Sequence, residues 1–87
     1  NARLRAPWCL SLKDKRAVIR PLMHQLRKTF NVTTAEAGEQ DIHSLLEIAI
    51  AALAFDAGQA DSIAENIHTF IQGATQAEII SWEKEFR

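Results

Sequence analysis

The chain has 87 residues, of which 47% are hydrophobic and 24% charged, and its formal net charge is −1. This composition excludes an intrinsically disordered chain and indicates a single folded domain spanning residues 1–87. The sequence has one cysteine, no recognisable secretory leader and no apolar run long enough to span a bilayer, so we expect a protein of the reducing cytoplasm.

The first predicted element is a short strand over residues 1–6. Small or apolar residues alternate there with Arg3 and Arg5, which is the period of a half-exposed strand, and Pro7 ends it. The strand has no lead-in, so we expect that residues are missing before Asn1.

A helix is predicted over residues 11–30, where Ser11 followed by Asp14 resembles a capping box. The apolar pattern continues in phase on both sides of Pro21, which predicts one bent helix rather than two. At 100° per residue the segment has two faces. The apolar face consists of Leu12, Ile19, Leu22, Met23, Leu26 and Phe30. The basic face consists of Lys13, Arg16, Arg20, His24, Arg27 and Lys28.

The basic face reflects a segregation of charge along the chain. Residues 1–30 hold eight Lys and Arg against Asp14 alone, a sum of +7, whereas residues 31–87 sum to −8. Such an asymmetry is typical of proteins that contact a polyanion or associate with themselves. The alternative is a basic face that is only solvated.

Two strands are predicted next. Residues 32–37 are rich in β-branched side chains, and Gly38 and Asp41 then mark a turn. The alanines of 43–55 favour a helix, but we interpret this segment as a strand from its place between the other elements.

The last elements are a helix and a strand. Asp56 and Gln59 suit a second capping box, and Gly73 is expected to stop the helix. The strand over 77–86 has apolar residues at period two, namely Ile80, Trp82 and Phe86. The complete order predicts an α+β, ferredoxin-like βαββαβ fold, in which a four-stranded antiparallel sheet carries both helices on one face.

Several segments resemble the YlxP-like family of small bacterial proteins, a domain of unknown function. They are Ser11 to Arg16, Phe30-Asn31-Val32, Ala35-Glu36, Gly38 to Asp41 with the following Ile42-His43, and Ile79 to Phe86. The resemblance covers essentially the whole chain and implies the ferredoxin-like fold with a strand over 43–55. Some relatives are encoded near genes for translation initiation and ribosome maturation, which implies a link to RNA or the ribosome. The chain departs from the family pattern at Pro21, Leu45, Ala49, Ala54 and Phe55.

The sequence holds little chemistry that would support catalysis. Asp41 and His43 are too few for a metal site, and no glycine-rich phosphate loop is present. Cys9 is either a packed thiol or a thiolate favoured by the following helix N-terminus. Trp8 and Trp82 are either base-stacking platforms or anchors of the core or of an interface. We therefore expect no enzyme, no cofactor, no metal and no small-molecule substrate.

Two hypotheses about function remain. In the first, the basic face docks on structured RNA or the ribosome through Lys13, Arg16, Arg20, Arg27 and Lys28. In the second, the protein is an interaction module that forms a homodimer through the uncovered face of its sheet. The residues predicted to line that face are Leu45, Ala49, Ala51 and Leu53.

Overall fold

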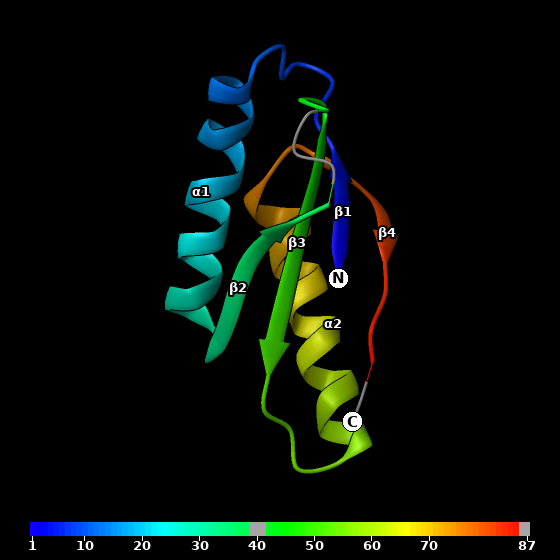
Figure 1. Ribbon diagram of the computed structural model, residues 1–87. Coiled ribbons are helices and arrows are strands. Elements are labelled where there is room, and N and C mark those ends of the chain that lie inside the picture. Colours follow the sequence, from blue (N-terminus) through cyan, green and yellow to red (C-terminus); the bar gives the residue numbers. More distant parts are fainter. Residues whose placement is uncertain (39–41, 86–87) are drawn as a thin grey trace.

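Strands and helices follow one another in the predicted order in a computed structural model, which describes residues 1–38 and 42–85 (Figure 1). The elements are β1 (Ala2–Arg5), α1 (Leu12–Thr29), β2 (Val32–Ala37), β3 (Leu45–Ala52), α2 (Ala57–Ala74) and β4 (Glu78–Trp82). The segment 43–55 therefore contains a strand, because its apolar residues alternate between the two faces of the sheet.

The four strands form one antiparallel sheet in the order β2-β3-β1-β4. Both helices lie on the same side of this sheet, with α1 beside β2 at the left of the view and α2 behind β3 (Figure 1). The predicted ferredoxin-like fold is thereby confirmed.

The core lies between the sheet and the helices. In β1 the inward residues Ala2 and Leu4 have no exposed surface, while Arg3 and Arg5 point to the uncovered face. This alternation is the period-two pattern read from the sequence. The other large members of the core are Ile19, Leu22, Leu26, Leu46, Ile48, Ile67 and Ile71.

Both helices begin with the predicted caps. The Ser11 hydroxyl accepts a hydrogen bond from the Asp14 amide at 3.1 Å, and the Asp56 carboxylate accepts one from the Gln59 amide at 2.8 Å. Each cap satisfies an amide that has no partner inside its helix. Pro21 lies within a continuous α1, so the single helix is confirmed and the bend stays a prediction.

The predicted ends differ from the structure at three places, one of which is the strand predicted over 77–86, which ends at Trp82. Gly73 does not stop α2, which runs to Ala74 and is capped by Thr75 in extended backbone. Gly73 has no positive φ angle, so it supplies none of the left-handed geometry for which glycine is needed at a helix end. The strand 43–55 is also shorter than predicted, because β2 provides partners only as far as Ala52.

The apolar pattern predicted for the last strand was wrong at Ile80. The register with β1 shifts between Ile79 and Ser81, so one extra residue lies on the β4 side. This β-bulge turns Ile79 and Trp82 toward the core and leaves Ile80 37% exposed. The predicted partner Phe86 lies outside the described residues.

Gly38, which was predicted to mark a turn after β2, has a positive φ angle. Its φ is +77°, and a Cβ at this position would come within 2.5 Å of Glu47 Oε1. The backbone conformation favours glycine, and a side chain here would also force the Glu47 side chain to move.

We predict that Gly38→Ala destabilises the fold by about 1–2 kcal/mol, because a left-handed backbone is strained for any other residue. Urea unfolding followed by circular dichroism measures this change. Gly73→Ala is the matched control, since the residue is helical and a Cβ added there would meet no neighbouring atom within 4 Å. It should stabilise α2 by about 0.5–1 kcal/mol. Equal effects at both glycines would contradict the prediction.

Candidate nucleic-acid interface

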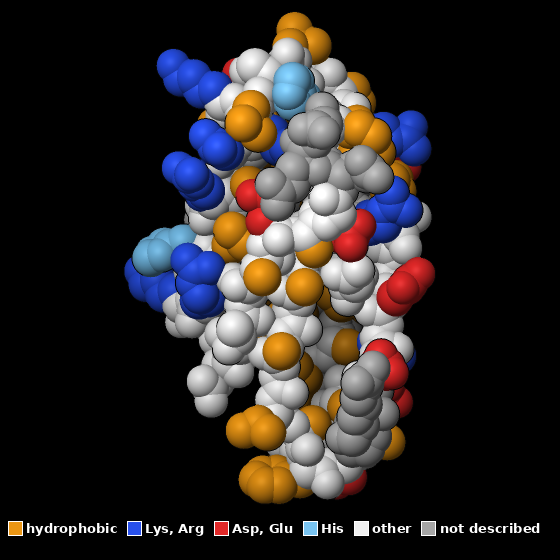
Figure 2. All heavy atoms as spheres, viewed as in Figure 1, with side chains coloured by type: hydrophobic (Ala, Val, Ile, Leu, Met, Phe, Trp, Pro, Cys, Tyr) orange, Lys and Arg blue, Asp and Glu red, His pale blue; other side chains and the backbone are white. Residues whose placement is uncertain are grey.

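The basic side chains of α1 form a continuous stripe on the outside of the molecule. Figure 2 shows Lys and Arg side chains along the edge that α1 occupies in Figure 1. All six predicted members are exposed, namely Lys13, Arg16, Arg20, His24, Arg27 and Lys28. We call this surface the basic stripe. From Lys13 to Arg27 it is about 21 Å long at 1.5 Å per residue.

The opposite face of α1 is buried in the core. Ile19 and Leu26 have no exposed surface and Leu22 has 3%. Leu12, which was predicted on the same face, is the first residue of α1 and is 37% exposed. The apolar and basic arcs of the helix are therefore separated as its periodicity predicts.

Lys15 belongs to the buried face and was missed by the sequence reasoning. Its residue is 1% exposed, and its Nζ donates a hydrogen bond to the Ile42 carbonyl at 3.3 Å. Position 15 is one helical turn before Ile19, so its spacing placed it on the apolar face even though its charge suggested the other. The ammonium holds the segment before β3 against the start of α1.

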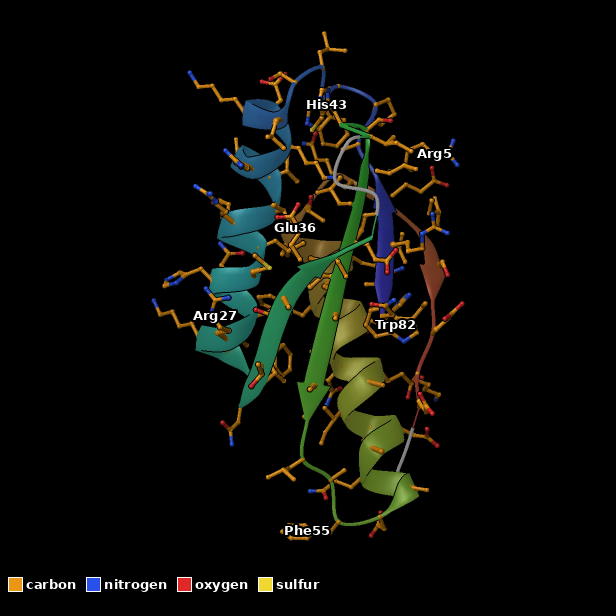
Figure 3. All side chains as sticks on the ribbon, in the orientation of Figure 1. Arg5, Arg27, Glu36, His43, Phe55 and Trp82 are labelled. Atoms are coloured by element: carbon orange, nitrogen blue, oxygen red, sulfur yellow. The ribbon has the colours of Figure 1, made fainter. Side chains whose placement is uncertain are left out.

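Arg27 differs from the other residues of the stripe because it has a partner in the sheet. Its Nη1 donates a hydrogen bond to the Thr34 hydroxyl of β2 at 2.7 Å. Glu36 lies on the same face of β2 as Thr34 and extends toward α1 (Figure 3). Arg27 and Glu36 are not within ion-pair distance of each other.

The remaining cations of the stripe have no carboxylate partner within residues 1–38 and 42–85. The ion pairs in this part of the chain lie elsewhere, between Arg3 and Glu47 at 3.4 Å and between Lys84 and Asp61 at 2.8 Å. Most carboxylates visible in Figure 2 lie away from α1. The stripe is thus an uncompensated positive surface at one side of the molecule.

The predicted self-association face is the side of the sheet that faces the viewer in Figure 1. Leu45 and Ala49 are partly buried there, Ala51 is exposed, and Leu53 follows the end of β3 with 92% of its surface exposed. Glu47 separates Leu45 from Ala49 and accepts a hydrogen bond from Asn1 Nδ2 at 2.8 Å. The apolar strip is therefore interrupted by a polar cluster.

The two tryptophans lie in different surroundings. The Trp82 ring packs edge-on against His68 of α2, with 4.9 Å between ring centroids, and so belongs to the inner face of the sheet. Trp8 lies in the turn between β1 and α1 and is 49% exposed. Of the two predicted base-stacking platforms, Trp8 is accessible from solvent.

Cys9 is a packed thiol. It is 3% exposed, and burial raises the pKa of its thiol, with a smaller contribution in the same direction from Asp14. Lys15 acts against this shift without outweighing it. The helix N-terminus therefore does not make Cys9 a thiolate.

A cleft of about 1000 Å³ opens between the end of β3 and the segment after β4, with α2 as its floor. Its inner wall includes Ile63, Ile67 and Trp82. The ionisable groups at its edge are Asp61 and Lys84, which are paired with each other, and Glu83 and Glu85. The cleft therefore combines an apolar inner wall with a charged edge.

Neither helix of the described residues is long and apolar enough to cross a membrane. No three His, Cys, Asp or Glu side chains in residues 1–38 and 42–85 gather closely enough to hold a metal ion. Asp41, half of the pair considered from the sequence, lies outside these ranges.

A family model described as "Protein of unknown function (DUF503)" matches residues 1–84. The expectation of an uncharacterised domain is confirmed over nearly the whole chain, while the YlxP-like assignment stays a prediction. No curated protein and no solved structure matches the chain significantly.

We predict that the Cys9 thiol of the folded protein reacts at least about tenfold more slowly with a thiol reagent than that of the urea-unfolded chain, because reaction requires local opening.

The raised pKa of Cys9 also predicts how the free energy of unfolding depends on pH. The folded state holds its proton more tightly, so this contribution to stability is present below the ordinary thiol pKa of 9.0 and is lost as pH rises through the folded-state pKa. Stability that rises above pH 9 through this thiol, measured against Cys9→Ala, would contradict the assignment.

Proposed function

The chain belongs to the family described as protein of unknown function (DUF503), and this membership does not indicate an activity. From the surface of the protein we propose that α1 docks on the phosphate backbone of structured RNA. The observation that carries this proposal is the basic stripe. Its cations point away from the core, and within the described residues Lys13, Arg16, Arg20 and Lys28 have no carboxylate partner. The protein acts as a binding module, with no catalytic step.

The shape of the stripe suits a backbone rather than a base sequence. A row about 21 Å long follows several phosphates of one strand. The major groove of duplex RNA is deep and narrow, so a helix of this kind lies across the backbone and the 2′-hydroxyls instead of entering it. Recognition therefore depends on charge and shape and weakens steeply with salt.

We favour ribosomal RNA as the structured RNA that α1 contacts. The resemblance to a family with relatives encoded near ribosome-maturation genes supports this choice. The acidic remainder of the chain supports a single orientation on the RNA, because residues 31–87 sum to −8 and repel a polyanion.

We predict that the triple variant Arg16→Gln, Arg20→Gln, Lys28→Gln binds RNA roughly 10- to 100-fold more weakly than the wild type at about 50 mM salt. Arg27 is left in place because its hydrogen bond to Thr34 is structural. The measurements are titration of a labelled duplex RNA hairpin and co-sedimentation with ribosomal subunits. The slope of log affinity against log salt should fall by about 2–3, or roughly one for each lost phosphate contact.

The matched control neutralises the three described cations that lie outside α1, through Arg3→Gln, Arg5→Gln and Lys84→Gln. Both triple variants change the net charge from −1 to −4. The control also removes the exposed ion pairs Arg3–Glu47 and Lys84–Asp61, so the thermal stability of both variants is measured alongside binding. The control should bind within about twofold of the wild type. Absence of binding by the wild type, or equal losses in the two variants, would refute docking through α1.

A second candidate is self-association through the uncovered face of the sheet. Its specific support is Leu53, which is 92% exposed next to the small side chains Ala49 and Ala51. A nearly fully exposed leucine beside other apolar side chains is a feature of contact sites between proteins. This candidate does not exclude RNA binding by α1, which lies on the other side of the sheet.

For this second candidate we predict that the wild type is a dimer at tens of micromolar and that Leu53→Glu is a monomer, because a carboxylate cannot be buried unpaired in the contact. Light scattering measures the mass of both. Leu10→Glu is the matched control, since Leu10 is 82% exposed and lies at the other end of the molecule. A monomeric wild type would rule the candidate out.

A further inference from the structure

Building on the RNA proposal, we propose that Trp8 stacks on an unpaired base beside the backbone that α1 holds. The preferred ligand is then an RNA duplex that ends in a loop or a single-stranded overhang. Trp8 adds a stacking contact with a base to the phosphate contacts of the basic stripe. Stacking on a side chain requires an unpaired base.

The backbone around Trp8 is fixed. The Cys9 amide donates a hydrogen bond to the Ala6 carbonyl at 2.9 Å, which closes a turn with Pro7 and Trp8 at its centre. Pro7 restricts the turn through its ring. Ala6 and Cys9, at the two ends of the turn, have 0% and 3% of their surface exposed and anchor it in the core.

The turn is also joined to the start of the basic stripe. The Leu10 amide donates a hydrogen bond to Asp14 Oδ2 at 3.1 Å, and the Asp14 amide donates one to the Ser11 hydroxyl. Trp8 therefore keeps a defined position relative to the first turn of α1, which carries Lys13. An aromatic ring on a fixed backbone loses little freedom when a base stacks on it.

The exposed part of the Trp8 side chain makes no contribution to the packing of the fold. Packing removes the apolar surface of an indole from water, and the partly buried Trp82 packs its ring against His68 of α2 in this way. Trp8 leaves 49% of its surface in solvent although both ends of its turn are buried. A base that stacks on the ring would remove this apolar surface from water.

The arrangement fits RNA better than a membrane surface. An interfacial helix carries apolar residues along the whole face that enters the lipid. The apolar face of α1 is instead buried in the core, and exposed apolar residues gather at one end of the helix. These are Trp8, Leu10, Leu12 and Ile42. A row of charges with an aromatic ring at its end matches a phosphate backbone that leads to an unpaired base.

The test compares two RNAs that share one duplex, one blunt and one with a short single-stranded overhang. The wild type should bind the overhang RNA roughly 5- to 100-fold more tightly than the blunt RNA. Trp8→Ala should bind both RNAs with the affinity of the wild type for the blunt one. Trp8→Phe should keep most of the preference, because phenylalanine also stacks. The fluorescence of Trp8, taken as the difference between wild type and Trp8→Phe, should change with the overhang RNA and not with the blunt RNA.

The outcomes separate this inference from the proposal on which it rests. If the wild type binds neither RNA, docking of RNA by α1 is itself refuted. If it binds both equally and Trp8→Ala changes nothing, RNA docking stands and base stacking by Trp8 is overturned. Co-sedimentation of the wild type, but not Trp8→Ala, with vesicles of phosphatidylserine and phosphatidylcholine would assign the ring to a lipid surface and also overturn the inference.

Discussion

The rotation of α1 about its own axis is the constraint on which the protein's surface depends. Ile19, Leu22 and Leu26 are buried, and each contributes about 1.5–3 kcal/mol relative to an exposed position. Lys15 adds a directional contact, since a buried ammonium needs the carbonyl oxygen of Ile42. Any rotation of the helix would expose these side chains and bury unpaired cations of the basic stripe. The core, rather than any contact of the cations themselves, therefore directs the stripe outward.

The net charge of −1 is a poor guide to how this surface interacts with a ligand. The molecule measures 41 × 21 × 18 Å, whereas charges are screened over about 8 Å at physiological ionic strength. Carboxylates on the far side of the sheet therefore exert almost no electrostatic force on a ligand at α1. They matter at low salt and during approach, when they disfavour every other orientation.

The helix caps, the basic stripe and the order of elements that identifies the fold could be predicted from the sequence, whereas strand register and the burial of individual polar side chains could not. Ser11 and Asp56 cap their helices as expected, because a cap depends on residues a few positions away. The basic stripe followed from helical periodicity in the same way. The bulge at Ile80 depends on the register with a strand far away in the sequence, which no local pattern contains. The burial of Lys15 was not predicted, because we interpreted its charge as a sign of exposure although its position in the helix placed it on the apolar face.

The place of β1 in the sheet has a consequence for the order of folding. Its two neighbours are β3 and β4, and Ala2 pairs with Trp82, whereas β2 and β3 are joined by a short connection. Pairing β1 with β4 closes a long loop and lowers the entropy of the chain. The contacts between the two strands offset this cost only once they have formed. This topology favours an order in which the β2–β3 hairpin assembles with α1 first and β1 joins its two partners afterwards. In that order β1, which precedes the other elements along the chain, is the strand that completes the sheet.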